Sequence, residues 1–294
     1  MAEVKNKKIV VVTGDVTIDW NIARLRRGAG FGHVWNADDL TSACCQRGGA
    51  AMLADLIKAV AENLRQAKQA GVTVRQISVP RDRICPDDRR FHHSYAIWEP
   101  FESVDPRTNQ KKRVWRVSEF LGLYQTNGQS LLSDNWKKVI RDPANADIVV
   151  LDDAALGFRD HPEYWPQALS SKESKPWVIL KMARPVAQGG LWNYLQRNHA
   201  DHLIAIMTAN DLRRSQVHIS RQVSWERTAQ DLVWELIYNA HVNELARCAH
   251  VIVSFGAEGA ILLSTKSRGA PDAMLLFDPR AMEGEWIRQH KGYM

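Results

Sequence analysis

The sequence lacks the features that mark several large classes of protein. No apolar run approaches the roughly eighteen residues that a membrane-spanning helix needs, so nothing predicts a membrane span. The four cysteines, Cys44, Cys45, Cys85 and Cys248, include no Cys-x-x-Cys pair and form no regular framework. This set predicts four free thiols in a reducing compartment rather than a disulfide scaffold.

Targeting signals and charge blocks are also missing. The N-terminal stretch from Met1 to Lys8 is short and charged, unlike a signal peptide, and it predicts a cytoplasmic protein. The only compact basic run, Lys111-Lys112-Arg113, is too short to indicate nucleic-acid binding and predicts the solvated tip of a hairpin. A net charge of +6 fits an anionic ligand such as a nucleotide, and it fits general solubility equally well.

What is present is an ordinary folded composition. The chain has 294 residues, of which 45% are hydrophobic and 24% charged. This length suffices for one large α/β domain, or for a domain with a smaller lid. Internal repeats and low-complexity segments are absent from the sequence.

The stretch from Ile9 to Asp19 is the most informative one. Its first four residues are apolar and mostly β-branched, which predicts a strand buried on both faces in a parallel sheet. Gly14 allows a sharp turn at the carboxyl end of this strand, where α/β sheets bind ligands. Asp15 and Asp19 are therefore candidate ligand contacts. In the alternative interpretation Asp15 caps a turn and Asp19 lies on the surface.

Two glycine-rich segments follow. The loop over 26–32 carries no Gly-Lys-Ser/Thr and does not directly follow a strand, so we expect a mobile loop near a ligand rather than a phosphate-binding loop. Gly48-Gly49 opens the first clear helix, and exposed backbone N–H groups there can receive ligand oxygens. Close packing of the helix start on the sheet is the alternative. Gly71 ends the helix, and 72–79 predicts a strand.

Residues 90–121 change character. Two β segments, 91–98 and 113–117, are joined by a polar, turn-rich stretch, and such an inserted hairpin often forms a lid. His92 and His93 are adjacent, so in a strand they face opposite sides and do not predict a metal pair.

The second half alternates strands with helices. Strands are predicted at 147–153, 177–181, 202–207, 250–255, 260–264 and 274–277, and helices at 162–169, 189–197 and 224–247. The predicted strand ends carry polar or glycine residues, namely Asp152, Asp153, Lys181, Asn210 and the turn 256–259. Crossover helices bring such ends to one edge. The sequence thus predicts a three-layer, doubly wound, mostly parallel α/β fold with a small β lid.

The order of these motifs resembles the ribokinase-like (PfkB-type) carbohydrate and nucleoside kinases. The resemblance rests on the strand ending Gly14-Asp15-Val16-Thr17-Ile18-Asp19, on Gly48-Gly49-Ala50, on the lid at 90–121, and on the segment Val253-Ser254-Phe255-Gly256-Ala257-Glu258-Gly259-Ala260. Together these span most of the chain, and they imply one ribokinase-like domain over 1–294.

The resemblance also implies ligands and contacts. A small hydroxylated substrate would be held by Asp15, Asp19, Gly48 and Gly49. ATP, with Mg²⁺, would lie beside Asn210, Gly256, Glu258 and Gly259. Lids in this family often pair between subunits, so a homodimer through the lid is implied, with neither nucleic acid nor membrane as a partner.

Two motifs of the family are not matched. Its Asn-x-x-Glu motif begins at Asn210, but Arg213 holds the acid position, and Asp211 is nearby at the wrong spacing. Its Gly-Ala-Gly-Asp motif, which supplies the catalytic base and a phosphoryl-binding helix N-terminus, is missing after Gly259; Gly28-Ala29-Gly30 comes far too early. No catalytic residue and no metal ligand is therefore assigned. We expect either a fragment of a longer chain or a shortened relative.

Two functions remain open at this point. The chain is an ATP-dependent kinase domain for a sugar or nucleoside hydroxyl, with its base supplied from elsewhere, or a non-catalytic ribokinase-like domain that binds a ligand or partner within a larger regulatory protein. A Rossmann-type dinucleotide binder is disfavoured, because no Gly-x-Gly-x-x-Gly follows the first strand.

Overall fold

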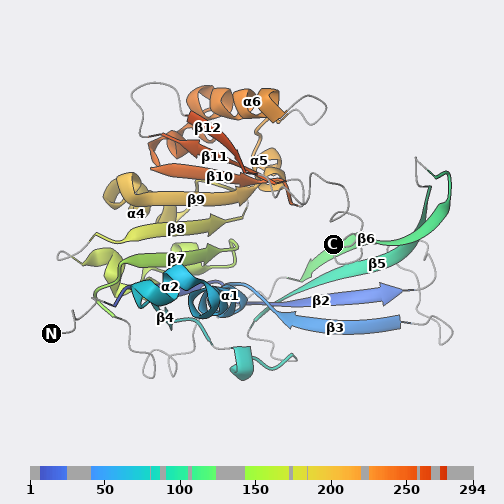
Figure 1. Ribbon diagram of the computed structural model, residues 1–294, viewed down its shortest axis with the longest axis horizontal. Helices are drawn as coiled ribbons and strands as arrows, with labels where there is room; N and C mark the ends of the chain where they lie inside the picture. Colours follow the sequence, from blue (N-terminus) through green and yellow to red (C-terminus); the bar gives the residue numbers. More distant parts are fainter. Residues whose placement is uncertain are drawn as a thin grey trace.

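The computed structural model describes residues 7–24, 41–79, 81–86, 91–104, 108–123, 143–171, 175–183, 185–219, 225–256, 259–265 and 272–276. In this part of the chain the strands form an eight-stranded sheet and a separate four-stranded sheet (Figure 1). The strands of the main sheet are β1 (Ile9–Gly14), β4 (Thr73–Gln76), β7 (Ile148–Asp153), β8 (Trp177–Met182), β9 (Leu203–Thr208), β10 (His250–Ser254), β11 (Ala260–Ser264) and β12 (Asp272–Leu276).

The main sheet has the order β12-β11-β10-β9-β8-β7-β1-β4. Six neighbouring strands of this sheet, β4, β1, β7, β8, β9 and β10, are parallel to one another. Strand β11 pairs antiparallel with β10, and β12 pairs antiparallel with β11 at the edge. The predicted mixed α/β fold with a mostly parallel sheet is confirmed. The helices among the described residues are α1 (Ala50–Asn63), α2 (Arg65–Ala70), α4 (Gly190–Asn198), α5 (Ala209–Arg214) and α6 (Trp225–Tyr238).

Strand β1 is buried on both faces, as its apolar run predicts. Val10 and Val12 pack with Ala54 of α1, whereas Val11 belongs to the large core on the opposite face. That core also contains buried side chains of α4, α5 and α6. Helix α1 lies over β1, β4 and β7, so the sheet is the middle of three layers there (Figure 1). No described helix is long and apolar enough to span a membrane.

Two predicted helices are shorter or tighter than expected. The segment 162–169 forms the 3₁₀ turns η3 (Pro162–Tyr164) and η4 (Gln167–Ser170), because Pro166 lacks an N–H donor and holds the preceding residue in an extended conformation. Helix α6 ends at Tyr238, where the side chain of Asn239 accepts a hydrogen bond from the N–H of His241. A 3₁₀ turn, η6 (Asn243–Arg247), follows. The remaining 3₁₀ turns are η1 (Arg81–Arg83), η2 (Phe158–Asp160) and η5 (Ala200–His202).

The predicted lid hairpin is present and longer than expected, as β5 (His92–Val104) and β6 (Lys111–Leu123). It is joined by β2 (Thr17–Arg24) and β3 (Thr41–Arg47), which the sequence analysis did not predict, in the order β3-β2-β5-β6. These two strands carry mixed polar and apolar residues, so the pairing of β2 with β5 and of β3 with β2 defines them rather than their own pattern. The sheet extends beyond the carboxyl edge of the main strands (Figure 1).

This second sheet corrects the expected position of Asp19. The sequence analysis placed Asp19 at the carboxyl end of β1, four residues beyond the turn. In the structure it is the third residue of β2, paired with Gln46 on one side and Ser94 on the other. Asp15 alone remains at the end of β1.

We predict that buried side chains of α4 contribute more to the free energy of unfolding than exposed side chains of α1 do. Leu195 in α4 is fully buried, so Leu195→Ala should lower the free energy of unfolding by about 2–5 kcal/mol. Leu56 in α1 is 55% exposed, and Leu56→Ala should change it by about 0.5 kcal/mol or less. Urea unfolding curves measure both values, and equal effects of the two substitutions would contradict this placement of the core.

Candidate functional site

A row of polar side chains lies at the carboxyl ends of four adjacent parallel strands. Asp152 is paired with Lys181 across β7 and β8, and Thr208 is paired with Ser254 across β9 and β10. Lys181 is also paired with Ile206, two residues before Thr208, so all four side chains share one face. This is the face that α1 covers farther along the sheet. We call Asp152, Lys181, Thr208 and Ser254 the edge row.

An ion pair joins the first two members of the edge row. Lys181 Nζ lies 2.9 Å from Oδ1 and 3.0 Å from Oδ2 of Asp152. The Asp152 side chain is 2% exposed, whereas that of Lys181 is 55% exposed. Burial raises the pKa of Asp152, the Lys181 ammonium lowers it, and the charges of Asp153 and Asp19 raise it again. The edge therefore carries a buried carboxylate whose counter-ion remains accessible.

Asp19 lies where the second sheet meets the start of α1. It is half-buried, and its carboxylate accepts hydrogen bonds from the hydroxyls of Ser94 on β5 and Thr17 on β2. A Cβ atom on Gly48 would lie only 2.2 Å from Asp19 Oδ2. Since Asp19 also influences the pKa of Asp152, this carboxylate and the edge row are electrostatic neighbours.

The two glycines before α1 allow a close approach of backbone segments. Gly49 has a φ of +63°, and a Cβ there would lie 2.3 Å from the carbonyl oxygen of Asp15. The same carbonyl accepts a hydrogen bond of 2.8 Å from the N–H of Ala50, and the N–H of Gly48 donates to the carbonyl of Thr17. The helix start is therefore closely packed at Gly48 and Gly49, and a ligand contact at these two glycines stays a prediction.

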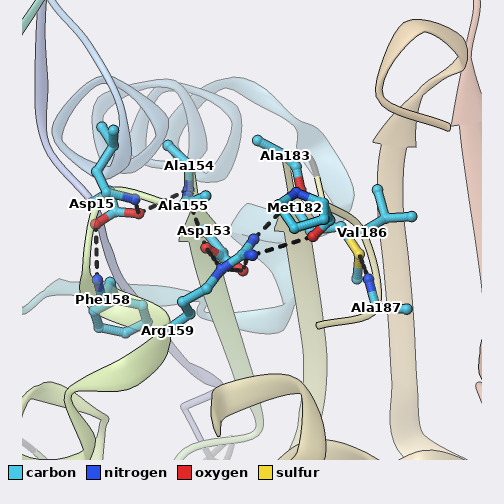
Figure 2. A network of polar contacts seen from close by, with 12 residues as sticks. Asp15, Asp153, Ala154, Ala155, Phe158, Arg159, Met182, Ala183, Val186 and Ala187 are labelled. Carbon is cyan, nitrogen blue, oxygen red and sulfur yellow. Dashed lines mark hydrogen bonds and ion pairs between the residues drawn. The ribbon is translucent and has the colours of Figure 1, made fainter. Parts of the chain in front are cut away.

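Asp15 is fully buried at the end of β1 and faces a loop rather than solvent (Figure 2). Its Oδ2 accepts hydrogen bonds from the N–H groups of Ala154, at 2.8 Å, and Leu156, at 3.2 Å. Its Oδ1 accepts one from Phe158 at 3.1 Å. Burial raises the pKa of Asp15 to about 7, against the lowering effect of these donors. Both carboxylate oxygens are thus engaged in holding the loop after β7.

A further ion pair, with both partners buried, fixes the other end of this loop, and sequence reasoning missed it. The guanidinium Nε of Arg159 lies 2.9 and 3.1 Å from the two carboxylate oxygens of Asp153 (Figure 2). Arg159 also donates to the carbonyls of Pro185 and Ala183, after β8. Gly157-Phe158-Arg159 gave no signal for this role, because the pair with Asp153 depends on how the loop folds back and the two carbonyl partners lie after β8.

The residues expected beside a nucleotide follow β9 and β10. Asn210 is exposed on α5, and its Oδ1 accepts a hydrogen bond of 3.2 Å from Arg213. The carboxylate of Asp211 accepts hydrogen bonds from the backbone and hydroxyl of Thr208, which forms a capping box at the start of α5. Asp211 therefore acts as the N-terminal cap of α5.

The glycine turn after β10 is present, as the sequence predicts. Gly256 and Gly259 have φ values of +68° and +115°, and the N–H of Gly259 donates to the carbonyl of Gly256. A Cβ on Gly256 would meet no heavy atom within 4 Å, so space is open beside this glycine among the described residues. Glu258 lies outside the described residues. The nucleotide contacts of this turn stay a prediction.

The described residues contain no group of three or more His, Cys, Asp or Glu side chains that could hold a metal ion. His93 Nδ1 accepts a hydrogen bond of 3.1 Å from the indole of Trp20. His92 is buried, and burial lowers its pKa, while contact with the backbone of Leu156 raises it. His92 thus lies against the loop that Asp15 holds.

We predict that Asp15 makes stability pH-dependent. Its pKa is raised from 3.8 to about 7, so between these values the folded state retains a proton that the unfolded chain releases. The free energy of unfolding from this group is therefore highest below about pH 4 and falls as pH rises to about 7. Asp15→Asn, which cannot titrate, should flatten this slope in urea unfolding measured from about pH 5 to 8.

A matched control is Asp201→Asn. Asp201 is exposed, and the hydrogen bond from Lys175 lowers its pKa, so it stays ionised throughout this range. This variant should keep the slope of the wild type. If Asp15→Asn also kept that slope, the protonation of Asp15 assigned here would be wrong.

Among the comparisons with known proteins, only the one with solved structures finds similar proteins. No family model and no curated protein matches the chain. Ribokinase from Arabidopsis thaliana, solved with ribose and ATP, shares 19% identity over 91% of this chain and 77% of its own, with a TM-score of 0.40. A Methanocaldococcus jannaschii nucleoside kinase of the ribokinase family shares 13% sequence identity over 98% of this chain and 86% of its own, with a TM-score of 0.41. Escherichia coli phosphofructokinase-2, solved with fructose-6-phosphate, shares 10% sequence identity over 97% of this chain and 87% of its own, with a TM-score of 0.44. Likeness at this level assigns neither a family nor a function.

Proposed function

We propose that residues 1–294 form a ribokinase-like domain that binds a small hydroxylated substrate and ATP for phosphoryl transfer to a substrate hydroxyl. The observation that carries this proposal is the arrangement along one edge of the sheet. Asp19 and Gly48 lie together beside Asp152 at one end of the edge row, and the open turn at Gly256 follows its other end.

The substrate end consists of Asp19 with the backbone at Gly48 and Gly49. An ionised carboxylate offers about four acceptor sites, and two protein hydroxyls use two of those on Asp19. The remaining capacity suits the hydroxyl groups of a sugar or nucleoside. Asp15 is assigned a positioning role instead, because its oxygens hold the loop over 154–158.

The nucleotide end consists of Asn210, Gly256, Glu258 and Gly259. Gly256 fits a ligand because the space where a Cβ would stand is open. ATP would supply the phosphoryl group that is transferred. No Mg²⁺ ligand is assigned, because the described residues hold no group of three or more His, Cys, Asp or Glu side chains and Asp211 caps α5. In a phosphoryl-transfer site Mg²⁺ needs only one or two carboxylates beside the nucleotide phosphates, so it would be held chiefly through ATP.

The rate of transfer depends on two elements that the sequence does not match. A general base typically contributes about 10²–10⁴-fold, and oriented N–H donors at the transferring group add a further large electrostatic term. The family's Gly-Ala-Gly-Asp motif supplies both, and it is missing after Gly259. Binding without turnover is the property of the alternative, a non-catalytic ligand-binding domain of a larger protein.

The second sheet is the proposed lid and the proposed surface for a homodimer. Trp115 and Val117 of β6 are 39% and 45% exposed, which leaves apolar area for a second copy of the sheet. The lid contributes Ser94 to the Asp19 site, so its position and substrate binding are coupled.

Calorimetric titration of the 294-residue chain with Mg-ATP and with Mg-ADP tests the proposal first. We expect saturable binding of both, followed by ADP formation when a panel of sugars and nucleosides is added. Binding without ADP formation from any substrate would support the non-catalytic alternative. A folded chain that binds neither nucleotide would overturn the proposal.

We predict that single substitutions separate the two ends. Asp19→Ala should weaken binding of the hydroxylated ligand by about 10- to 100-fold, since hydrogen bonds to a charged group contribute about 1.5–3 kcal/mol. Nucleotide affinity should stay within about twofold. Gly256→Val should do the reverse, because a β-branched residue resists a positive φ. Equal losses of both ligands in either variant would contradict the assignment.

A further inference from the structure

Lys181 is the cation of the edge row, and none of the roles above uses it. It stands on β8, next to Asp152 of β7 and two strands from Ser254 of β10. Its ammonium has three N–H donors, and Asp152 is the hydrogen-bonding partner of that ammonium. The side chain is 55% exposed while its partner is 2% exposed, so the charge reaches the surface of this edge.

The position of Lys181 fits the middle of the proposed ligand path. Adjacent strands lie about 5 Å apart, so β1 and β10 are separated by about 19 Å along the edge. Asp19 and Gly48 lie near the β1 end, and the turn at Gly256 follows β10. A phosphoryl group in transfer between the ends must lie in line between attacking and leaving oxygens. That places the phosphate chain over β8.

We propose that Lys181 binds the phosphate groups of the nucleotide and that Asp152 positions its ammonium. This inference rests on the proposed function. A lysine ammonium acts on phosphate as a strong point charge. Here it is supplied from a rigid strand, and a buried carboxylate restricts it to the α1 face of the sheet.

The arrangement also accounts for the local charge. Asp19 and Asp152 bring two carboxylates to this region, and the charge of Asp19 raises the pKa of Asp152. Phosphate groups would be repelled there without a cation. Lys181 therefore separates a substrate end that accepts hydroxyls from a nucleotide end that tolerates anions.

The competing explanation is that Lys181 is only the counter-ion of Asp152. The two explanations differ in which ligand is affected by its loss. A phosphate contact distinguishes ADP and ATP from adenosine, which has the same base and ribose but no phosphate. A structural counter-ion affects all three ligands together, through the unpaired buried carboxylate.

The experiment measures ADP, ATP and adenosine binding to the full chain by titration calorimetry, with adenosine also measured by competition. Lys181→Gln should weaken the binding of ADP and ATP by about tenfold or more and leave the affinity for adenosine unchanged. The double variant Asp152→Asn with Lys181→Gln leaves no buried unpaired charge and should show the same selective loss. Thermal melting of each variant confirms that it is folded.

Lys175→Gln is the matched control, because it removes the same charge at the opposite end of β8. Lys175 pairs with Asp201 and is 43% exposed, and its loss should leave all three affinities unchanged. Recovery of ADP affinity in the double variant, or equal loss of adenosine, would overturn the phosphate role and leave the proposed function standing. So would wild-type ADP affinity in Lys181→Gln. A wild type that binds neither ADP nor ATP would overturn both.

Discussion

The buried carboxylate of Asp15 is the constraint on which the site depends. Its side chain binds the N–H groups of the loop after β7, and its carbonyl receives the N–H of Ala50 at the start of α1. One residue thus ties β1, the first helix and the loop beside the edge row. A buried carboxyl normally requires such donors, and here burial still outweighs them enough to raise its pKa to about 7.

Glycine makes the same junction possible from the other side. Side chains at Gly48 and Gly49 would collide with Asp19 and with the backbone of Asp15. Because glycine avoids both collisions, the start of α1 approaches Asp19 of the second sheet closely, and Asp19 remains near enough to Asp152 to raise its pKa. The proposed lid therefore contributes directly to the proposed substrate end, through Ser94 and Asp19.

Two ion pairs neutralise the carboxylates along this edge, and they differ in the exposure of their cations. Asp153 and Arg159 neutralise each other in the interior and fix the loop, whereas Lys181 neutralises Asp152 from the surface. Both pairs contain a buried carboxylate, but only the second leaves its cation accessible. This difference in exposure is why a ligand contact is proposed for Lys181 and not for Arg159.

The sequence by itself determined the mostly parallel sheet, because long apolar β-branched runs such as Val10-Val11-Val12 can only be buried on two faces. It also determined that polar or glycine residues follow the strands, including the turn over 256–259. Tertiary structure decided the different roles of the two acids: Asp15 binds the loop after β7, and Asp19 lies in the second sheet. It also decided β2, β3 and the Asp153–Arg159 pair. These depend on partners more than seventy residues away, on cross-strand pairing, or on geometry between loops, and local periodicity does not encode such contacts.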